Sequence, residues 1–206
     1  MSTVAFICAA KLISHINYIE PTRTKMETLM YNGEIVRRDI EQIYKGLYLE
    51  AVCCFEHFLE DLFIGLLTGR FKHPSPSVVP RVTFKSSKVA RDIVLGGHNY
   101  VDWLPYNHTK QRANAFFRNG LPFTLLEPRD KQIIEQICHI RNAIAHQSNH
   151  AKKQFDDKVI GDIPIPPRDR TPAAFLRSKF RIAPVQSRYE NLIIEMAGIA
   201  IKLCRL

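Results

Sequence analysis

Hydrophobic positions along the chain recur mostly at helical spacing. Between residues 32 and 69 the apolar side chains follow one another at steps of mostly three and four, which is typical of one face of a helix. Asn32 is suited to cap the start of this helix and Gly69 its end. We therefore predict a helix of about 35 residues, roughly 50 Å long, as the central rod of a bundle. The stripe consists of Val36, Ile40, Ile43, Leu47, Phe55, Phe58, Leu62 and Leu66.

Shorter helices are predicted on both sides of this rod. A first helix is expected near residues 4–18, and Ser86 and Gly96 bracket another. Three prolines make residues 70–85 a loop or short extended piece. A further short helix is expected from Thr109 to about Arg118.

The second half of the chain continues the pattern. Pro128 suits the first turn of a helix, because its missing N–H costs nothing there. Residues 151–171 are polar and proline-rich and are predicted to form a loop, followed by a short helix from Thr171-Pro172 to about Phe180. The prediction is an all-α helical bundle, one domain over residues 1–206. Its core covers roughly residues 32–150, with a C-terminal helix at 185–204 packed on it.

Charge is distributed unevenly over the chain. The net charge is +9, but residues 1–69 carry 6 basic and 9 acidic residues (6 − 9 = −3) and residues 70–206 carry 23 and 11 (23 − 11 = +12). A basic region of this size suggests a polyanionic partner, either nucleic acid or an anionic membrane surface, although solubility alone also explains it.

The cysteines and the lengths of the apolar runs indicate the cellular compartment. The five cysteines are an odd number and lie mostly within apolar runs, as buried reduced thiols of a cytoplasmic protein do. The N-terminal residues lack the basic segment of a signal peptide. No uninterrupted apolar run reaches about 18 residues, so no membrane span is expected.

The most informative chemistry lies on the predicted helix after Pro128. With about 100° per residue, Arg141, Asn142 and His146 project from the side opposite the isoleucine core stripe, and His150 continues that sector. Asn142 and His146 are neighbours at i and i+4. The stripe consists of Ile133, Ile137, Ile140 and Ile144.

These residue types suit cleavage of a phosphodiester. An imidazole can take up or release a proton near neutral pH. A guanidinium can hold a phosphate through two hydrogen bonds and stabilise the charge of the transition state. Since RNA supplies its own 2′-OH nucleophile, Arg141 and His146 suffice for transesterification without a metal, and Asn142 can orient the imidazole or bind the phosphate.

Arg-Asn-x-x-x-His on an amphipathic helix, after a long helix containing YLEAVCCFEHFLEDLF, resembles the HEPN domain family. The segment YVDWLPYNHTKQRANAFFRNGLPF is similar to the RiboL-PSP-HEPN branch. The resemblance covers roughly residues 35–150. It implies an all-α homodimer in which two copies of the motif form one composite site, and it implies metal-independent endoribonuclease activity in toxin–antitoxin or antiphage defence.

The resemblance also implies residue roles. Arg141 would stabilise the scissile phosphate, His146 would be the general acid and base, and Asn142 matches the variable polar position. An antitoxin or another defence-system protein would be a further partner. Members paired with a nucleotidyltransferase carry a tyrosine two residues after the histidine, whereas this chain has Ser148, which argues against control by modification there.

Other residues are weaker candidates. Lys152 and Lys153 follow the motif and are expected to contact the RNA backbone, with the basic stretches 70–91 and 168–188 next in line. Unpaired bases could stack on aromatic side chains of the middle segment, namely Tyr100, Trp103 and Tyr106. His146 and His150 have the spacing of a metal pair, but no further ligand set is evident, and we expect no metal and no cofactor.

Two other functions remain open from the sequence. A non-catalytic HEPN module would bind RNA or a protein through the same basic surface. A helical scaffold within a larger complex would carry the motif incidentally, as an exposed polar helix face.

Overall fold

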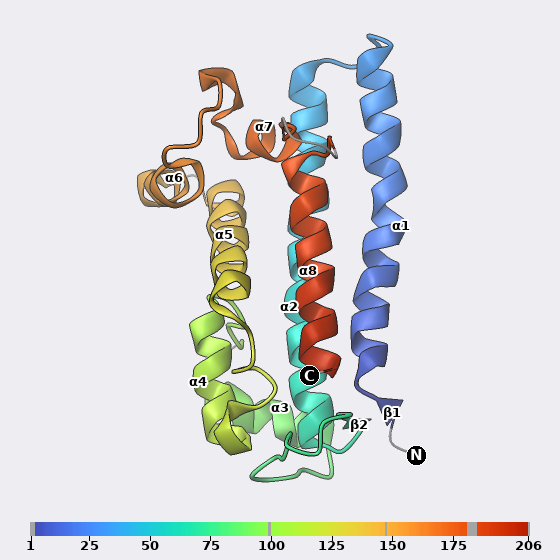
Figure 1. The fold of residues 1–206 in the computed structure, drawn as a ribbon, viewed down its shortest axis with the longest axis vertical. Helices are drawn as coiled ribbons and strands as arrows, with labels where there is room; N and C mark the ends of the chain where they lie inside the picture. Colours follow the sequence, from blue (N-terminus) through green and yellow to red (C-terminus); the bar gives the residue numbers. More distant parts are fainter. Residues whose placement is uncertain (1–2, 99, 147, 181–184, 206) are drawn as a thin grey trace. The chain divides into compact units, whose positions relative to one another are not determined.

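The computed structural model describes residues 3–98, 100–146, 148–180 and 185–205. It confirms the predicted all-α bundle (Figure 1). Two short parallel strands, β1 (Thr3–Val4) and β2 (Phe71–Lys72), are paired with Thr3 opposite Phe71. The α-helices are α1 (Phe6–Tyr31), α2 (Arg37–Leu67), α3 (Ser87–Leu95), α4 (Tyr106–Phe116), α5 (Pro128–Ala145), α6 (Asn149–Phe155), α7 (Pro172–Arg177) and α8 (Arg188–Arg205). Among the described residues, no helix combines the length and the apolar character that crossing a bilayer requires.

Several helix ends lie where local sequence signals predicted them. The Ser86 hydroxyl accepts a hydrogen bond from the N–H of Lys88, and Gly96, with φ +59°, ends α3 in the left-handed conformation that glycine adopts readily. The Thr171 hydroxyl accepts from the N–H of Ala174, and α7 begins with Pro172. Such caps supply partners for N–H groups that the helix itself leaves without one.

The first two helices have other limits than predicted. The first helix runs on from residue 18 to Tyr31 and passes through Pro21, whose side chain is exposed. Asn32 therefore does not cap the long helix. That helix begins at Arg37, and the N–H of Val36 is bound by the Asp39 carboxylate at 3.1 Å. Val36 precedes the helix and is 62% exposed, so it does not belong to the core stripe.

The predicted loop at 151–171 is wrong in its first half. Ser148 caps α6 by accepting from the N–H of Ala151, and a π-helical turn at Asp156–Ile160 continues it. Ala151, Phe155 and Val159 are buried. These positions are i, i+4 and i+8, so burial of one apolar stripe holds a helix that the polar composition obscured. A short 3₁₀ turn, η3 (Pro167–Asp169), precedes α7.

The chain divides into two compact units. Unit 1 consists of Met1–Ile13, Cys54–Ile134 and Met196–Leu206, and unit 2 of Ser14–Cys53 and Glu135–Glu195. The prediction of one domain over residues 1–206 stays a prediction.

The core of unit 1 is aromatic. The Phe63 ring lies with its centroid between 5.0 and 5.9 Å from those of four other aromatic rings, in tilted and edge-on geometries that favour attraction between π-systems. Gly65, one turn from Leu62, leaves room for the Phe71 ring, because a Cβ at residue 65 would lie 2.0 Å from that ring. The rings around Phe63 are those of Trp103, Phe116, Phe117 and Phe123.

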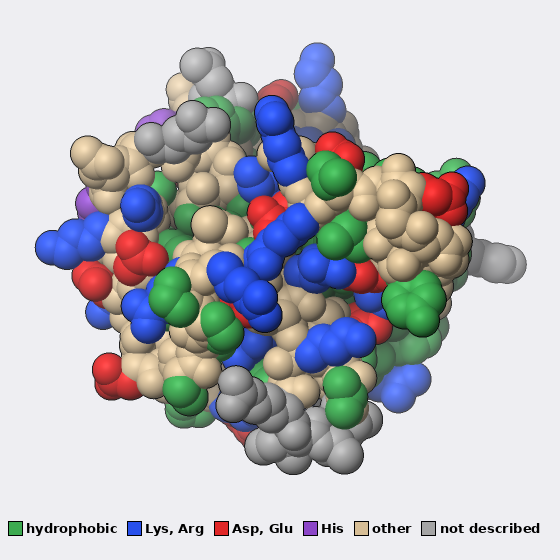
Figure 2. Space-filling model, turned by 90° about the horizontal axis from the view of Figure 1, so that it is seen from above, with side chains coloured by type: hydrophobic (Ala, Val, Ile, Leu, Met, Phe, Trp, Pro, Cys, Tyr) green, Lys and Arg blue, Asp and Glu red, His purple; other side chains and the backbone are tan. Residues whose placement is uncertain are grey.

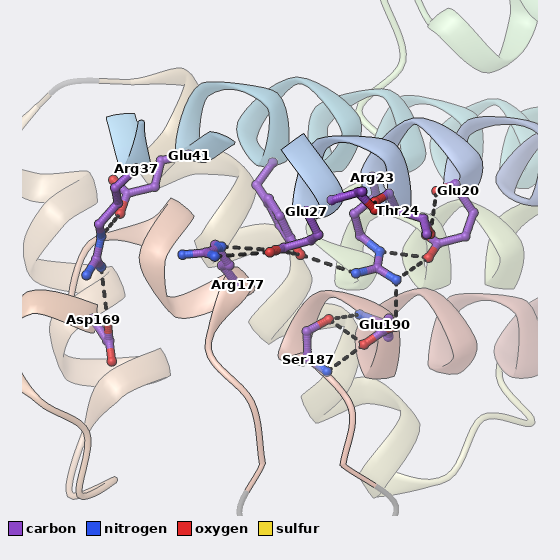
Figure 3. A network of polar contacts seen from close by, with 12 residues as sticks. Glu20, Arg23, Thr24, Glu27, Arg37, Glu41, Asp169, Arg177, Ser187 and Glu190 are labelled. Atoms are coloured by element: carbon purple, nitrogen blue, oxygen red, sulfur yellow. Dashed lines mark hydrogen bonds and ion pairs between the residues drawn. The ribbon is translucent and has the colours of Figure 1, made fainter. Parts of the chain in front are cut away.

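Unit 2 is held by a polar network in addition to its core (Figure 3). Arg23 of α1 donates to Glu190 of α8 at 2.6 Å. Glu27, one turn further on, accepts two hydrogen bonds from Arg177 of α7, both at 3.0 Å, and one from Tyr44 of α2 at 2.8 Å. These hydrogen bonds join four helices of unit 2. Because the arginine and glutamate partners are ionised, their bonds are about twice as strong as bonds between neutral groups.

Candidate functional site

The predicted catalytic histidine lies at the end of α5, in unit 2. The helix ends at Ala145, and the N–H of His146 still donates to the carbonyl of Asn142 at 2.8 Å. The His146 side chain is exposed. The expectation that His150 continues the same helical face is wrong, because His150 belongs to α6, which begins a new helix after Ser148.

Arg141 and Asn142 are half-buried one turn before the end of α5. The amide nitrogen of Asn142 lies 3.7 Å from the Cys138 sulfur, a contact back along the helix. The Tyr48 hydroxyl of α2 donates to the carbonyl of Ile137 at 3.2 Å. Burial raises the pKa of Tyr48 well above its ordinary value, whereas the positive charge of Arg141 acts to lower it.

His146 lines a pocket of about 370 Å³, referred to below as the His146 pocket. Three permanently charged cations share this lining with it: Lys45 of α2, Lys152 of α6 and Arg170. Asp156 contributes a single carboxylate. With His146 neutral, the charged lining sums to 3 − 1 = +2. In the part of the chain that the structure describes, neither the three cations nor Asp156 makes an ion pair, so the positive charge is available to a ligand.

The remaining wall of the His146 pocket is mixed. Phe155, Ile144 and Pro172 give it an apolar part, while Ser148 and Thr171 are the residues that cap α6 and α7. A pocket with an apolar wall and a few cations suits a ligand that carries both an apolar group and an anionic group such as a phosphate.

Most of the other predicted site residues do not line the His146 pocket. Lys152 lines the His146 pocket, whereas Lys153, also exposed, does not. Arg141 and Asn142 do not line it either, so the pocket of one chain brings together only part of the motif. Burial lowers the pKa of His139. Among the described residues there is no group of three or more His, Cys, Asp or Glu side chains arranged to hold a metal.

The aromatic candidates of unit 1 serve mainly the fold. Trp103 is buried and its indole N–H lies 3.4 Å from a Glu60 carboxylate oxygen. Tyr106 is buried and donates to the carbonyl of Phe123 at 2.9 Å. Tyr100 is 72% exposed and is the one of the three that offers a ring to solvent.

Sequence reasoning missed Lys45, which lies 101 residues before His146 in the chain (146 − 45 = 101) and belongs to no motif. Arg170 was predicted only as one member of the basic stretch 168–188. Seen end-on from the side of α7 and the α1–α2 turn, unit 2 shows Lys and Arg side chains gathered across the middle of the face (Figure 2). Part of the basic character predicted from composition therefore lies on this face.

The arrangement can bind an anion and exchange protons with it. Cations without carboxylate partners attract a phosphate, and an exposed imidazole within the same pocket can take up or release a proton. No protein-family model, curated protein or solved structure matches this chain.

Proposed function

We propose that this protein is a metal-independent endoribonuclease of HEPN type. The observation that carries the proposal is the His146 pocket, where the histidine of the Arg141-Asn142-x-x-x-His146 motif shares one cavity with Lys45, Lys152 and Arg170. A phosphodiester needs this combination, because its negative charge must be bound while protons move on and off its oxygens.

In the proposed reaction the 2′-oxygen of a ribose attacks the adjacent phosphorus and the bond to the 5′-oxygen breaks. His146 acts as the general acid and base: the 2′-OH gives up its proton and the leaving 5′-oxygen receives one. The products are a 2′,3′-cyclic phosphate and a 5′-OH. No metal or cofactor is required, since substrate and side chains supply the nucleophile and all the protons.

Arg141 is assigned to the charge that develops on the phosphate. Because Arg141 does not line the His146 pocket of its own chain, the proposal includes a homodimer in which a second copy brings its motif to the same phosphate. A role as a toxin or antiphage effector, restrained by an antitoxin or other partner in the cytoplasm, belongs to the proposal on the resemblance alone.

A non-catalytic RNA-binding module is the second candidate. The unpaired cations of the His146 pocket favour it equally, because they bind phosphate whether or not His146 transfers a proton. The two functions differ in the fate of the RNA.

The test incubates total RNA and purified tRNA with the wild type and with His146→Ala in excess EDTA, and maps the new ends. The proposal expects fragments with 2′,3′-cyclic phosphate ends from the wild type only. RNA that stays intact with the wild type while remaining bound would replace the nuclease by the binding module.

A further inference from the structure

A second basic cavity lies beside the His146 pocket in unit 2. This cavity of about 280 Å³, referred to below as the Arg177 pocket, is lined by four cationic side chains and two carboxylates. Its charge therefore sums to 4 − 2 = +2, the same as that of the His146 pocket. The cations are Arg37, Arg168, Arg177 and Lys179, and the carboxylates are Glu27 and Asp169.

Both carboxylates of the Arg177 pocket are already bound by arginines. Glu27 receives both of its ion-pair contacts from Arg177, and Asp169 is held by Arg37 at 3.0 Å. Arg168 and Lys179 are exposed and form no ion pair within the described parts of the chain. The excess positive charge of this pocket is thus carried by two side chains that project into solvent.

The two pockets are separated by one short segment. Arg168 and Asp169 line the Arg177 pocket, Arg170 and Thr171 line the His146 pocket, and Ala174 of α7 lines the Arg177 pocket again. Arg37 fixes this segment, because it donates to the carbonyl of Arg168 at 2.8 Å as well as to Asp169.

Helix α2 sets the spacing of the two pockets. Arg37 lines the Arg177 pocket and Lys45 the His146 pocket, eight residues later on the same helix. At 1.5 Å per residue this is about 12 Å along the helix axis. With about 3.4 Å between successive nucleotides of a stacked strand, that distance corresponds to three or four nucleotides.

We infer that Lys152, Lys45, Arg170, Arg168 and Lys179 form a basic track that binds the backbone of single-stranded RNA beyond the nucleotide in the His146 pocket. Figure 2 shows Lys and Arg side chains following one another across this end of unit 2. Cations spaced over two cavities fit a flexible chain of phosphates better than one compact anion. The inference rests on the proposed function for its choice of RNA as the polyanion.

The test separates binding from cleavage by using 2′-O-methyl oligoribonucleotides, which lack the 2′-OH nucleophile. A 2-mer and an 8-mer are titrated by fluorescence anisotropy at several salt concentrations. The full-length protein carries Arg168→Ala with Lys179→Ala. The matched control carries Lys11→Ala with Arg118→Ala, which removes the same charge from two exposed side chains of unit 1 that form no ion pair among the described residues.

Each phosphate contact in a single strand contributes about 0.7 to the slope of log affinity against log salt. The track variant should therefore reduce this slope by about 1.4 and weaken binding of the 8-mer roughly 25-fold at 0.1 M salt. Binding of the 2-mer should not change, and the control should stay within about twofold of the wild type.

Equal affinity of the wild type and the track variant for the 8-mer would contradict the proposed basic track and would not affect the proposed nuclease activity. Equal losses from the track and control variants would also contradict the track, since binding is then diffuse. A wild type that binds neither oligonucleotide, or binds vesicles of anionic lipid more tightly than the 8-mer, overturns the track, while cleavage of unmodified RNA still decides the proposed function separately.

Discussion

Unit 1 and unit 2 hold cavities of similar volume but use their charged groups differently. One cavity of unit 1, about 400 Å³, is lined by His98, His108 and Arg112 among others. Arg112 donates to the carbonyl of Asp102, and its guanidinium carbon lies 5.7 Å from the centre of the Trp103 ring. This cation of α4 therefore supports the loop that precedes the helix.

The cations of the His146 pocket have no such partners within the described residues. Lys45, Lys152 and Arg170 are exposed or half-exposed in this cavity of about 370 Å³. The two cavities therefore differ in how their cations are used far more than in volume. Positive charge that the fold itself does not use is the more informative feature.

The largest expected effect concerns the chemistry assigned to unit 2. His146→Ala should reduce metal-free RNA cleavage by about 10²- to 10⁴-fold, the usual contribution of a general acid or base. Arg141→Ala should cause a loss of similar order by removing stabilisation of the transition state. Initial cleavage rates on a labelled RNA measure both.

Because Arg141 is half-buried, far-UV circular dichroism and the thermal midpoint must accompany its rates. A folded Arg141→Ala protein that retains the wild-type rate would contradict the assignment. Arg141→Lys keeps the charge but loses the planar pair of donors, and we expect it to rescue the rate only in part.

Phe63→Ala addresses the other side of the comparison, the aromatic core of unit 1. Removing a ring packed against four others should lower the free energy of unfolding by about 3–5 kcal/mol. Urea denaturation followed by fluorescence measures it. Val36→Ala is the control, since that exposed side chain should change stability by no more than about 0.5 kcal/mol; equal effects would refute the assigned core.

Glu27→Gln tests whether unit 2 depends on its polar network. Burial acts to raise the pKa of Glu27, but the hydrogen bonds from Arg177 and Tyr44 and the charge of Arg177 outweigh it, so the pKa lies below its ordinary value of 4.5. A depressed pKa stabilises the folded protein above that value, and the contribution disappears as the pH falls below it. The substitution should cost about 1–2 kcal/mol at pH 7.

The acid limb of the stability curve sharpens this prediction. Thermal midpoints measured from pH 7 to pH 3 should fall less steeply for Glu27→Gln than for the wild type, because one native carboxylate no longer needs to stay ionised. Asp92→Asn, an exposed carboxylate of α3, should leave the slope unchanged. Parallel slopes for Glu27→Gln and the wild type would mean that Glu27 contributes nothing.

The smallest expected effect separates two adjacent lysines. Lys152 lines the His146 pocket and Lys153 does not. Lys152→Ala should weaken RNA binding about fivefold at 0.1 M salt, the share of one phosphate contact, and Lys153→Ala should weaken it less. Anisotropy with a 2′-O-methyl RNA measures both, and the reverse order would show that the pocket is not where the backbone binds.

Local signals predicted much of the fold. Caps at Ser86, Gly96 and Thr171 depend on the hydrogen-bonding and backbone preferences of single residues, and the structure has them where the sequence placed them. The continuation of α1 past Pro21 could not be predicted in this way. Its support comes from Arg23 and Glu27 contacting helices far away in the chain.

The candidate site was predictable only in part. His146 and Lys152 belong to one stretch of sequence, so the motif singled out His146 and the position just after it singled out Lys152. Lys45 and Arg170 reach the same pocket from distant segments, and only tertiary packing brings them there. Because α6 begins a new helix at Asn149, His150 does not lie on the face of α5 where a continuous helix would have placed it.

The most direct test compares the two cavities through one histidine from each. Wild type, His146→Ala and His108→Ala are incubated with tRNA in EDTA, and cyclic phosphate ends are counted. We expect cleavage by the wild type and by His108→Ala and none by His146→Ala. Cleavage that survives in His146→Ala but disappears in His108→Ala would contradict this expectation and assign the chemistry to unit 1.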